Sequence, residues 1–250
     1  MQPVRERAVV CLSGGMDSCV CAALAARDYD AFALHCSYGQ RTEERELRSA
    51  RAVAEALGFQ EFLHLRLDIF RRIGGSALTD AHIEVPAAGA EIGAQIPVTY
   101  VPFRNAHFLS AAVSWAEVLG AKAVLIGAVE QDSSGYPDCR PAYYEAFQGL
   151  IRAGTREGDI VVRTPLIHMQ KKEIVALGLE VGAPLELTWS CYSGSELACG
   201  VCESCVLRLR AFEQAGIRDP IRYATQPDLG TEAGMEFYER AVLGGEPRHP

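Results

Sequence analysis

The sequence predicts a doubly wound α/β fold, in which a Rossmann-like parallel sheet carries a small zinc-binding region near the C-terminus. Two observations lead to this prediction. Short apolar runs alternate with helix-forming stretches over most of the chain, and four cysteines lie within residues 191–205. Alternating strands and helices form right-handed parallel crossovers, and such sheets bind their ligand at the carboxyl ends of the strands. We therefore expect residues 1–185 to form the α/β domain and residues 186–250 to form a zinc-binding region packed on it.

The first half of the chain contains three predicted strands and two predicted helices. The apolar run at residues 8–12 predicts a buried strand, and the Ala- and Leu-rich residues 19–26 predict a helix. The next predicted elements are a strand at 31–36, a helix at 43–57 ended by Gly58, and a strand at 61–67. Residues 68–99 show no sustained period, and loops of this length are typically functional lids or disordered segments.

The second half resumes the alternation. The predicted elements are a helix at 106–119, a strand at 123–127, a helix at 143–153, a strand at 159–163, and helices at 171–179 and 206–215. Asn105 is a candidate N-cap for the first of these helices, because its side chain can accept N–H groups at a helix start. From Asp219 onward Pro and Gly recur without an apolar face, so we expect irregular structure or a subunit contact there.

Composition excludes several classes of protein. The chain has 250 residues, of which 49% are hydrophobic, so it can bury a sizeable core. Its net charge of -8 argues against a broad surface for RNA or DNA, because such surfaces use clustered Lys and Arg. No apolar stretch is long enough to span a membrane, and residues 1–7 lead into a predicted core strand rather than a signal peptide. We therefore expect a cytoplasmic protein with small-molecule partners, no nucleic acid and no membrane.

A Gly-rich turn, Ser-Gly-Gly-Met-Asp-Ser at residues 13–18, joins the first predicted strand to the first helix. Its glycines let the backbone approach a ligand, the helix start offers free N–H groups, and Ser13 and Ser18 add hydroxyl donors, so the turn predicts an anion site. Asp17 would repel phosphates unless it caps the helix, meets a metal ion or meets a cation. The turn differs from the common mononucleotide and dinucleotide loops and resembles the pyrophosphate loop of N-type ATP pyrophosphatases. The alternative is a tight turn without a ligand.

The four C-terminal cysteines, Cys191, Cys199, Cys202 and Cys205, predict a metal site. Two residues separate each of the last three, and Cys-x-x-Cys turns place sulfur atoms at the separation that a tetrahedral zinc ion requires. Because four thiolates fill all positions, zinc here would be structural rather than catalytic. The alternative is a redox-active pair, since Cys-x-x-Cys also occurs in dithiol enzymes.

Four further positions suggest ligand chemistry. Arg41 follows the second predicted strand, at the ligand edge of the sheet, where it is either a phosphate or adenosine contact or a solvated turn residue. Arg104 and Asn105 can bind a purine edge or a carboxylate in a bidentate manner, although Asn105 has the alternative role of N-cap. Lys171 starts a predicted helix, which is unfavourable for a cation, so a compensating anion such as the ATP phosphates explains it. The alternative is a solvent-facing lysine.

The densest polar run of the chain, residues 127–141, begins where a predicted strand ends. Its carboxylates can accept hydrogen bonds from the ring N–H and the exocyclic amine of a guanine-like edge, and Asp138 is the candidate for that role. Tyr136 and Arg140 are further candidate substrate contacts, and the alternative is a polar surface loop. Cys139 is interpreted as a packing or substrate-contact residue, because the sequence links no histidine to it that would make it a nucleophile.

Together these motifs resemble the 7-cyano-7-deazaguanine synthase family, which has an adenine nucleotide alpha hydrolase-like fold. The loop and the cysteine cluster alone are typical of a broad superfamily, whereas Ser-Gly-Tyr-Pro-Asp-Cys-Arg at 134–140 is far more specific. The other matching stretches are Tyr-Gly-Gln-Arg at 38–41, Val-Pro-Phe-Arg-Asn at 101–105, Thr-Trp-Ser-Cys-Tyr at 188–192 and Cys-Gly-Val-Cys-Glu-Ser-Cys at 199–205. Two small departures are Cys19, where threonine is frequent, and Thr42, where histidine is frequent.

The resemblance implies that ATP, used with Mg²⁺, drives the conversion of 7-carboxy-7-deazaguanine and ammonia to a nitrile through adenylated acid and amide intermediates, in a homodimer. The residues we expect to bind ATP are Leu12, Ser13, Gly14, Gly15, Met16, Asp17, Ser18, Cys19, Arg41 and Lys171. Of these, the expected catalytic residues are Ser13, Asp17, Ser18 and Lys171. The expected substrate contacts are Arg104, Asn105, Tyr136, Asp138 and Arg140, and the four C-terminal cysteines are expected to hold one structural zinc ion per chain.

Two other interpretations of the sequence stay open. One is a tRNA-thiolating or other amide-forming relative, which needs a basic RNA surface or a catalytic sulfur carrier. The acidic charge balance and the full use of the clustered cysteines for zinc count against it. The other is a nucleotide-binding sensor or zinc-bearing adaptor without turnover, which steady release of AMP would exclude.

Overall fold

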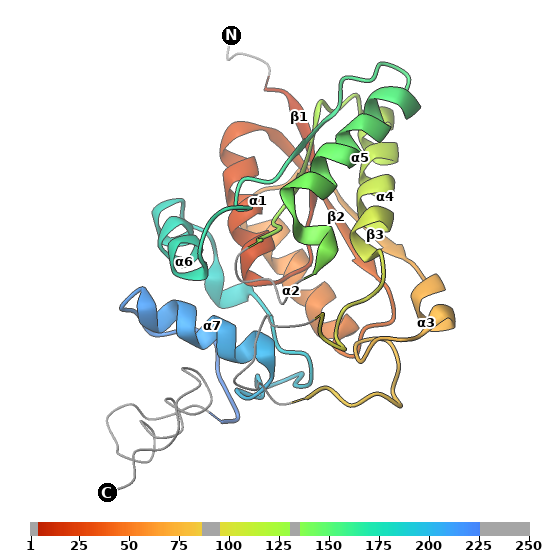
Figure 1. Ribbon diagram of the computed structural model, residues 1–250. Helices are drawn as coiled ribbons and strands as arrows, with labels where there is room; N and C mark the ends of the chain where they lie inside the picture. The colour runs from red at the N-terminus through yellow and green to blue at the C-terminus, as the bar shows by residue number, and fades with distance from the viewer. Residues whose placement is uncertain (1–4, 87–95, 131–135, 226–250) are drawn as a thin grey trace, which may run out of the picture.

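A five-stranded, fully parallel sheet forms the centre of the protein in a computed structural model, which describes residues 5–86, 96–130 and 136–225 (Figure 1). The strand order is β3-β2-β1-β4-β5. The strands are β1 (Arg7–Cys11), β2 (Asp30–Ser37), β3 (Phe62–Arg66), β4 (Ala123–Ile126) and β5 (Val161–Arg163). The chain winds outward from β1 in both directions, so a topological switch point lies between β1 and β4, as the predicted doubly wound sheet requires.

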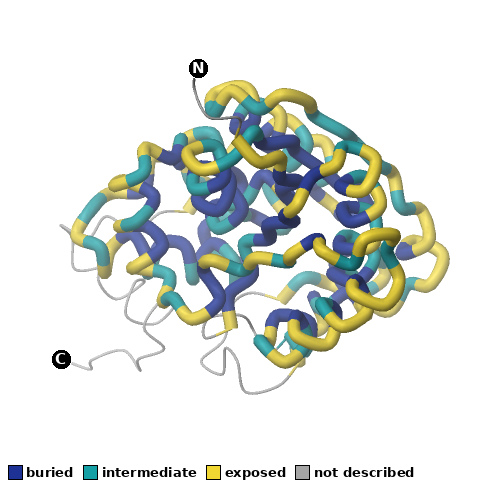
Figure 2. Tube along the Cα trace, turned by 90° about the horizontal axis from the view of Figure 1, so that it is seen from above, coloured by how far each residue is buried: buried dark blue, intermediate teal, exposed yellow. Residues whose placement is uncertain are grey.

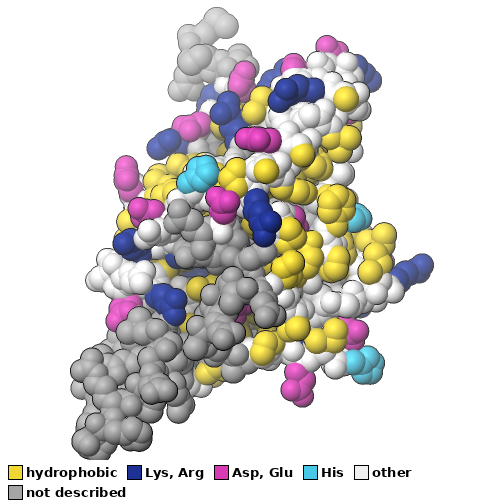
Figure 3. Space-filling view, in the orientation of Figure 1, with side chains coloured by type: hydrophobic (Ala, Val, Ile, Leu, Met, Phe, Trp, Pro, Cys, Tyr) yellow, Lys and Arg dark blue, Asp and Glu magenta, His cyan; other side chains and the backbone are white. Residues whose placement is uncertain are grey.

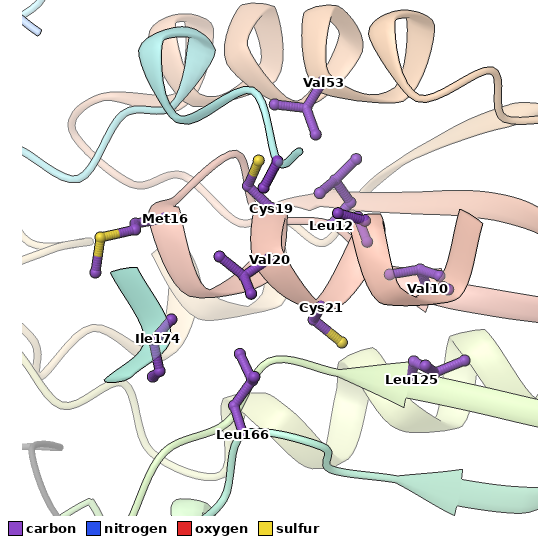
Figure 4. Packing of buried hydrophobic residues seen from close by; sticks show 14 of the residues in the cluster. Val10, Leu12, Met16, Cys19, Val20, Cys21, Val53, Leu125, Leu166 and Ile174 are labelled. Atoms are coloured by element: carbon purple, nitrogen blue, oxygen red, sulfur yellow. The ribbon is translucent and has the colours of Figure 1, made fainter. Parts of the chain in front are cut away.

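Helices cover both faces of the sheet. The α-helices of the described residues are α1 (Met16–Asp28), α2 (Glu43–Ala56), α3 (Ile69–Ile73), α4 (Arg104–Leu119), α5 (Pro141–Gly154), α6 (Lys171–Glu180) and α7 (Glu203–Gln214). Helices α1, α2 and α6 pack on one face, where Val10, Val20 and Ile174 belong to one buried cluster (Figure 4). Helices α4 and α5 pack on the other face through a second cluster. The buried stretches in Figure 2 accordingly run through the middle of the molecule, and exposed residues surround them.

The small residues of α1 explain its central place. Cys19, Cys21 and Ala22 are fully buried, so this helix lies close against the sheet, and it also contacts α6. Cysteine behaves here as a small apolar residue, as expected for the cysteines outside the C-terminal cluster. No helix in the described part of the chain is long and apolar enough to cross a membrane.

Two expectations about this fold were wrong. Helix α3 lies within the stretch 68–99, for which the sequence predicted no regular element, and one of its five residues, Phe70, is buried. Helix α4 begins at Arg104 with Phe103 as N-cap, so Asn105 lies inside the helix and is not its cap. Phe103 has a φ of 58°, a left-handed conformation that is unusual for an aromatic residue.

The C-terminal region packs on the α/β layer through α7, which lies beside α6 in Figure 1. Phe212 of α7 belongs to the same buried cluster as α1 and α6. Arg208 of this helix forms a fully buried, bidentate ion pair with Asp219, with N–O distances of 2.6 and 2.9 Å. Residues 219–225 are irregular apart from a bridge between Tyr223 and Ala198, and residues 226–250, part of the predicted irregular tail, lie outside the described residues.

Candidate active site

A cavity of about 300 Å³ lies at the carboxyl ends of β1, β2 and β4, the edge where a doubly wound sheet binds its ligand. The loop at 13–18, the first turns of α2 and α4, the start of α6 and the C-terminal region supply its walls. Of the expected ATP-binding residues, those that line it are Leu12, Ser13, Gly15, Met16, Asp17, Ser18, Arg41 and Lys171. Gly14 and Cys19 are buried beneath this surface.

Contacts within the protein hold the loop at 13–18 in place. Gly14 has a φ of +91°, and a Cβ atom there would lie 2.5 Å from the carbonyl oxygen of Glu46, so only glycine fits. Ser13 Oγ donates to Ser18 Oγ at 2.9 Å and accepts the N–H of Gly15 at 3.2 Å. The N–H of Trp189 donates to the Gly14 carbonyl at 2.8 Å, which ties the loop to the C-terminal region. The first N–H groups of α1 have no side-chain cap, as an anion site at a helix start requires.

Asp17 meets a cation, one of the three partners that the sequence left open. Lys171 Nζ, at the start of α6, donates to Asp17 Oδ2, although 154 positions separate the two residues. The other carboxylate oxygen, Oδ1, is buried and accepts no hydrogen bond within the described structure. The loop therefore places a lysine ammonium and an available carboxylate oxygen beside the start of α1, a combination suited to phosphates and their divalent cation.

Arg41 organises the rim of the cavity. Its guanidinium donates to the carbonyl oxygens of Ala77, Asp80 and Ile83, at 2.7, 3.2 and 2.6 Å. These bonds hold the segment after α3 against the start of α2. A phosphate or adenosine contact by Arg41 stays a prediction, since the described contacts of this side chain are with carbonyl groups.

The substrate candidates Arg104 and Tyr136 line the cavity together. Arg104 stacks between Tyr38 and Phe108 and donates to the Tyr38 hydroxyl at 3.0 Å, while its Nε is buried without a partner in the described structure. The Tyr136 hydroxyl lies 2.9 Å from Thr99 Oγ1. Burial raises the pKa of Tyr38 to about 12, so this hydroxyl stays neutral beside the arginine.

The remaining substrate candidates have other contacts. Asp138 is buried but does not line the cavity, and its Oδ2 accepts the N–H of Asn105 at 3.2 Å, at the start of α4. The Asn105 side chain, which does line the cavity, donates to the Asp138 carbonyl at 3.0 Å and to Cys139 Sγ at 3.7 Å. Arg140 is exposed at the N-cap of α5. The substrate roles of Asp138 and Arg140 stay predictions, and these contacts do not favour them.

Two details of the same stretch remain. Burial raises the pKa of the Cys139 thiol to about 11, so it stays protonated, which favours the packing role over a nucleophilic one. Ser134 and Gly135, which begin the specific motif, lie outside the described residues.

The four C-terminal cysteines converge on one point. Their sulfur atoms all lie within 4.8 Å of one another, and none of them forms a disulfide. Cys191 Sγ accepts N–H groups of Gly194 and Cys199 at 3.1 and 3.2 Å, and Cys199 Sγ accepts the N–H of Cys202 at 3.3 Å. Such N–H groups stabilise thiolates, so the donor set fits a metal ion better than a single dithiol pair.

Gly200 has a conformation that only glycine tolerates in this knuckle. Its φ is +81°, and a Cβ atom there would lie 1.7 Å from the Thr225 carbonyl oxygen. The backbone at Thr225 therefore lies directly against the knuckle of the cysteine cluster.

Two polar side chains are among the cavity residues that the sequence did not indicate. Glu46 of α2 and His35 of β2 both line the cavity. Glu46 stands in a helix rich in charged residues, a pattern that normally indicates a solvated face, so periodicity gave no signal for it. His35 is buried, and its Nδ1 donates to the Leu12 carbonyl oxygen at 2.8 Å. Burial lowers the pKa of His35 to about 4, so the ring is neutral at physiological pH.

The fold and the cavity together define a doubly wound α/β protein with a ligand cavity at the carboxyl ends of its strands and a four-cysteine cluster appended. A search of family models places residues 7–216 in the family described as Queuosine biosynthesis protein QueC. The chain belongs to this family.

Curated relatives agree with that assignment. The chain is 76% identical over 227 residues to the 7-cyano-7-deazaguanine synthase of Acidobacterium capsulatum, which covers 90% of this chain and 99% of the relative. It is 66% identical to the enzyme of the same name from Koribacter versatilis, over 87% of this chain and 93% of the relative. Among solved structures, the NMN synthetase of Francisella tularensis is similar with a TM-score of 0.43 and 16% identity, over 97% of this chain and 85% of that one. The expected family, the 7-cyano-7-deazaguanine synthases of queuosine biosynthesis, is therefore confirmed, and with it the expectation of an enzyme.

Proposed function

We propose that the chain uses ATP to convert 7-carboxy-7-deazaguanine and ammonia into 7-cyano-7-deazaguanine, through an amide. The observation that carries this proposal is that the loop at 13–18 and a half-buried arginine, Arg104, line one cavity. The first feature suits a nucleotide and the second suits a carboxylate, so one cavity can bring the two reactants together.

The difficulty of the reaction explains why ATP is needed twice. A carboxylate does not react with ammonia because its oxygen is a poor leaving group, so transfer of AMP to that oxygen makes it one that departs readily. The amide formed in this way is again inert to loss of water. A second transfer of AMP, to the amide oxygen, lets that oxygen depart with AMP and leaves the nitrile.

The residues of the loop would act on the phosphates in both halves of the reaction. The N–H groups at the start of α1 and the Lys171 ammonium would stabilise the charge that develops on pyrophosphate as it leaves. Asp17, with one oxygen held by Lys171, would present its other oxygen to the Mg²⁺ that accompanies ATP. Ser13 and Ser18 would add hydroxyl contacts to phosphate oxygens.

Arg104 would hold the carboxylate of the substrate until adenylation removes its charge. Arg104→Lys should raise the KM for the acid about ten- to hundredfold, a loss of about 1–3 kcal/mol, because lysine cannot reproduce the bidentate contact. The KM for ATP should change little. Steady-state release of AMP at varied acid and varied ATP measures both constants.

Arg140→Lys is the matched comparison, because Arg140 is a second arginine expected to contact substrate but is exposed outside the cavity. We expect a smaller effect there. A larger rise in the KM for the acid in Arg140→Lys than in Arg104→Lys would show that Arg140, and not Arg104, is the main contact of the carboxylate.

We further propose that the four cysteines hold one structural zinc ion per chain, since they supply a complete set of four sulfur donors.

A cytoplasmic homodimer without a nucleic-acid partner is the expected state. On the face shown in Figure 3, Lys and Arg side chains are interspersed with Asp and Glu, which supports the absence of a basic RNA surface there. Sedimentation of the purified protein would test the dimer.

The direct test of function is an incubation with ATP, Mg²⁺, ammonium and 7-carboxy-7-deazaguanine, followed by mass spectrometry. We expect the nitrile, with AMP and pyrophosphate, and its mass should rise by one unit when ¹⁵N-ammonium is supplied. Omission of ammonium should abolish the nitrile. A complete reaction mixture that yields neither AMP nor nitrile would favour the nucleotide sensor instead.

A further inference from the structure

The cavity contains a carboxylate for which the proposed mechanism has no role. Glu46 lies in the first turns of α2 and lines the cavity, opposite in charge to Arg104. Among the described residues that line the cavity, the acids are Asp17 and Glu46. Asp17 is engaged with Lys171 at the phosphate loop, so Glu46 is the acid left for the rest of the cavity.

Hydrogen bonds from two neutral side chains hold the Glu46 carboxylate in one orientation. The Thr42 hydroxyl donates to Oε1 at 2.7 Å, and Gln40 Nε2 donates to Oε2 at 3.0 Å. Gln40 is itself oriented, because its Oε1 accepts the N–H of Tyr38 at 2.8 Å. Each carboxylate oxygen thus accepts one bond from a neutral donor and keeps capacity for a second.

The charge of Glu46 lacks a direct ion pair in the described part of the chain. Burial raises the pKa of this carboxyl. The bonds from Thr42 and Gln40 and the charge of Arg104 offset only part of that rise. A partly desolvated carboxylate of this kind is costly unless further donors compensate it. Two N–H donors from a ligand, one for each oxygen, would remove that cost.

We propose that Glu46 binds the guanine-like edge of the substrate, accepting its ring N–H and its 2-amino group side by side. This inference rests on the proposed function and deepens it. It gives the role that the sequence suggested for Asp138 to a different carboxylate, because Asp138 is absent from the cavity lining and accepts the N–H of Asn105. Glu46 and Arg104 then recognise the donor edge and the carboxylate of one molecule.

The test compares 7-carboxy-7-deazaguanine with the same acid lacking its 2-amino group, by calorimetric titration in the presence of ATP without Mg²⁺. The normal protein should bind the parent acid about ten- to a hundredfold more tightly than the analogue, since one charge-assisted bond is lost. Glu46→Gln should weaken binding of the parent acid by a similar factor and bind both acids about equally, because the amide offers a donor where an acceptor is needed. The affinity for ATP should be unchanged.

Two further variants distinguish recognition from loss of structure. Glu46→Asp keeps the charge and should keep the preference for the 2-amino group, with weaker binding overall. Glu43→Gln changes another first-turn glutamate of α2, which pairs with Arg66 instead of lining the cavity, and should leave both affinities unchanged. Circular dichroism and Tm confirm that each variant is folded.

The alternatives give different outcomes. If Glu46→Gln keeps the full preference for the 2-amino group, the inference is overturned. If Asp138→Asn loses that preference instead, the recognition belongs to Asp138. An unchanged affinity for the acid with a raised KM for ammonium would assign Glu46 to the ammonia site. Because binding is measured without turnover, a protein that binds the acid with the expected preference but forms no nitrile would contradict only the proposed function.

Discussion

Asp17→Asn should abolish AMP formation, with a loss in kcat of at least about 10²–10³-fold, while the protein stays folded. Asp17 holds Lys171 and offers its second oxygen to a metal ion, so the change disturbs both contacts with the phosphates. Ser13→Ala should act in the same direction, because the Ser13 hydroxyl bonds to Ser18 and Gly15 within the loop. The rate of AMP release, measured by chromatography, gives the loss in kcat.

The matched control is Asp28→Asn. Asp28 is an acid at the far end of the same helix, where it pairs with Arg27 at the surface. This variant should release AMP at the normal rate. Near-normal AMP production by both Asp17→Asn and Ser13→Ala would contradict the assignment of the loop to ATP.

Cys202→Ser should unfold the C-terminal region and remove zinc. Cys202 is the N-cap of α7, and this helix packs into the main core through Phe212, so loss of the metal should spread beyond the knuckle. Loss of a metal ligand belongs among the largest single-residue effects, roughly 4 kcal/mol, which for a chain of this size lowers Tm by roughly 8–16 °C. Elemental analysis of the normal protein should give about one zinc per chain.

Cys21→Ser provides the comparison for this variant. Cys21 is fully buried in α1 and lies outside the cluster, so the change should lower Tm but leave the zinc content unchanged. In Cys202→Ser the main effect should be on stability, and the activity per folded molecule should change little. Freshly purified, unchelated protein without zinc would count against the structural metal site.

The sheet and the loop were predictable because their signals are local. Apolar runs of strand length, an Ala-rich helix and paired glycines between them specify the first crossover without reference to distant residues. The cysteine spacing is equally local, and it predicted a cluster that the structure forms. The five-residue helix α3 was missed because so short an element leaves no periodic pattern.

The walls of the cavity were harder to predict because they depend on which distant segments meet. Nothing near Asp17 in the sequence indicates that Lys171 is its partner, although the sequence did indicate that it needed one. Asn105 looked like a helix cap because a polar residue precedes an apolar periodic run, whereas α4 begins two residues earlier, at Arg104, with Phe103 as its N-cap. Glu46 and Asp138 are both acids in polar surroundings, and only the fold distinguishes the one in the cavity from the one beneath it.

In the mechanism we propose, one loop activates the substrate twice with ATP. The most direct measurement is the stoichiometry of a complete reaction, with AMP, pyrophosphate, amide and nitrile quantified from the same sample over time. Two molecules of AMP and two of pyrophosphate should form for each nitrile, with the amide rising first and then declining. One AMP per nitrile, or the appearance of ADP and phosphate in place of AMP and pyrophosphate, would contradict this mechanism.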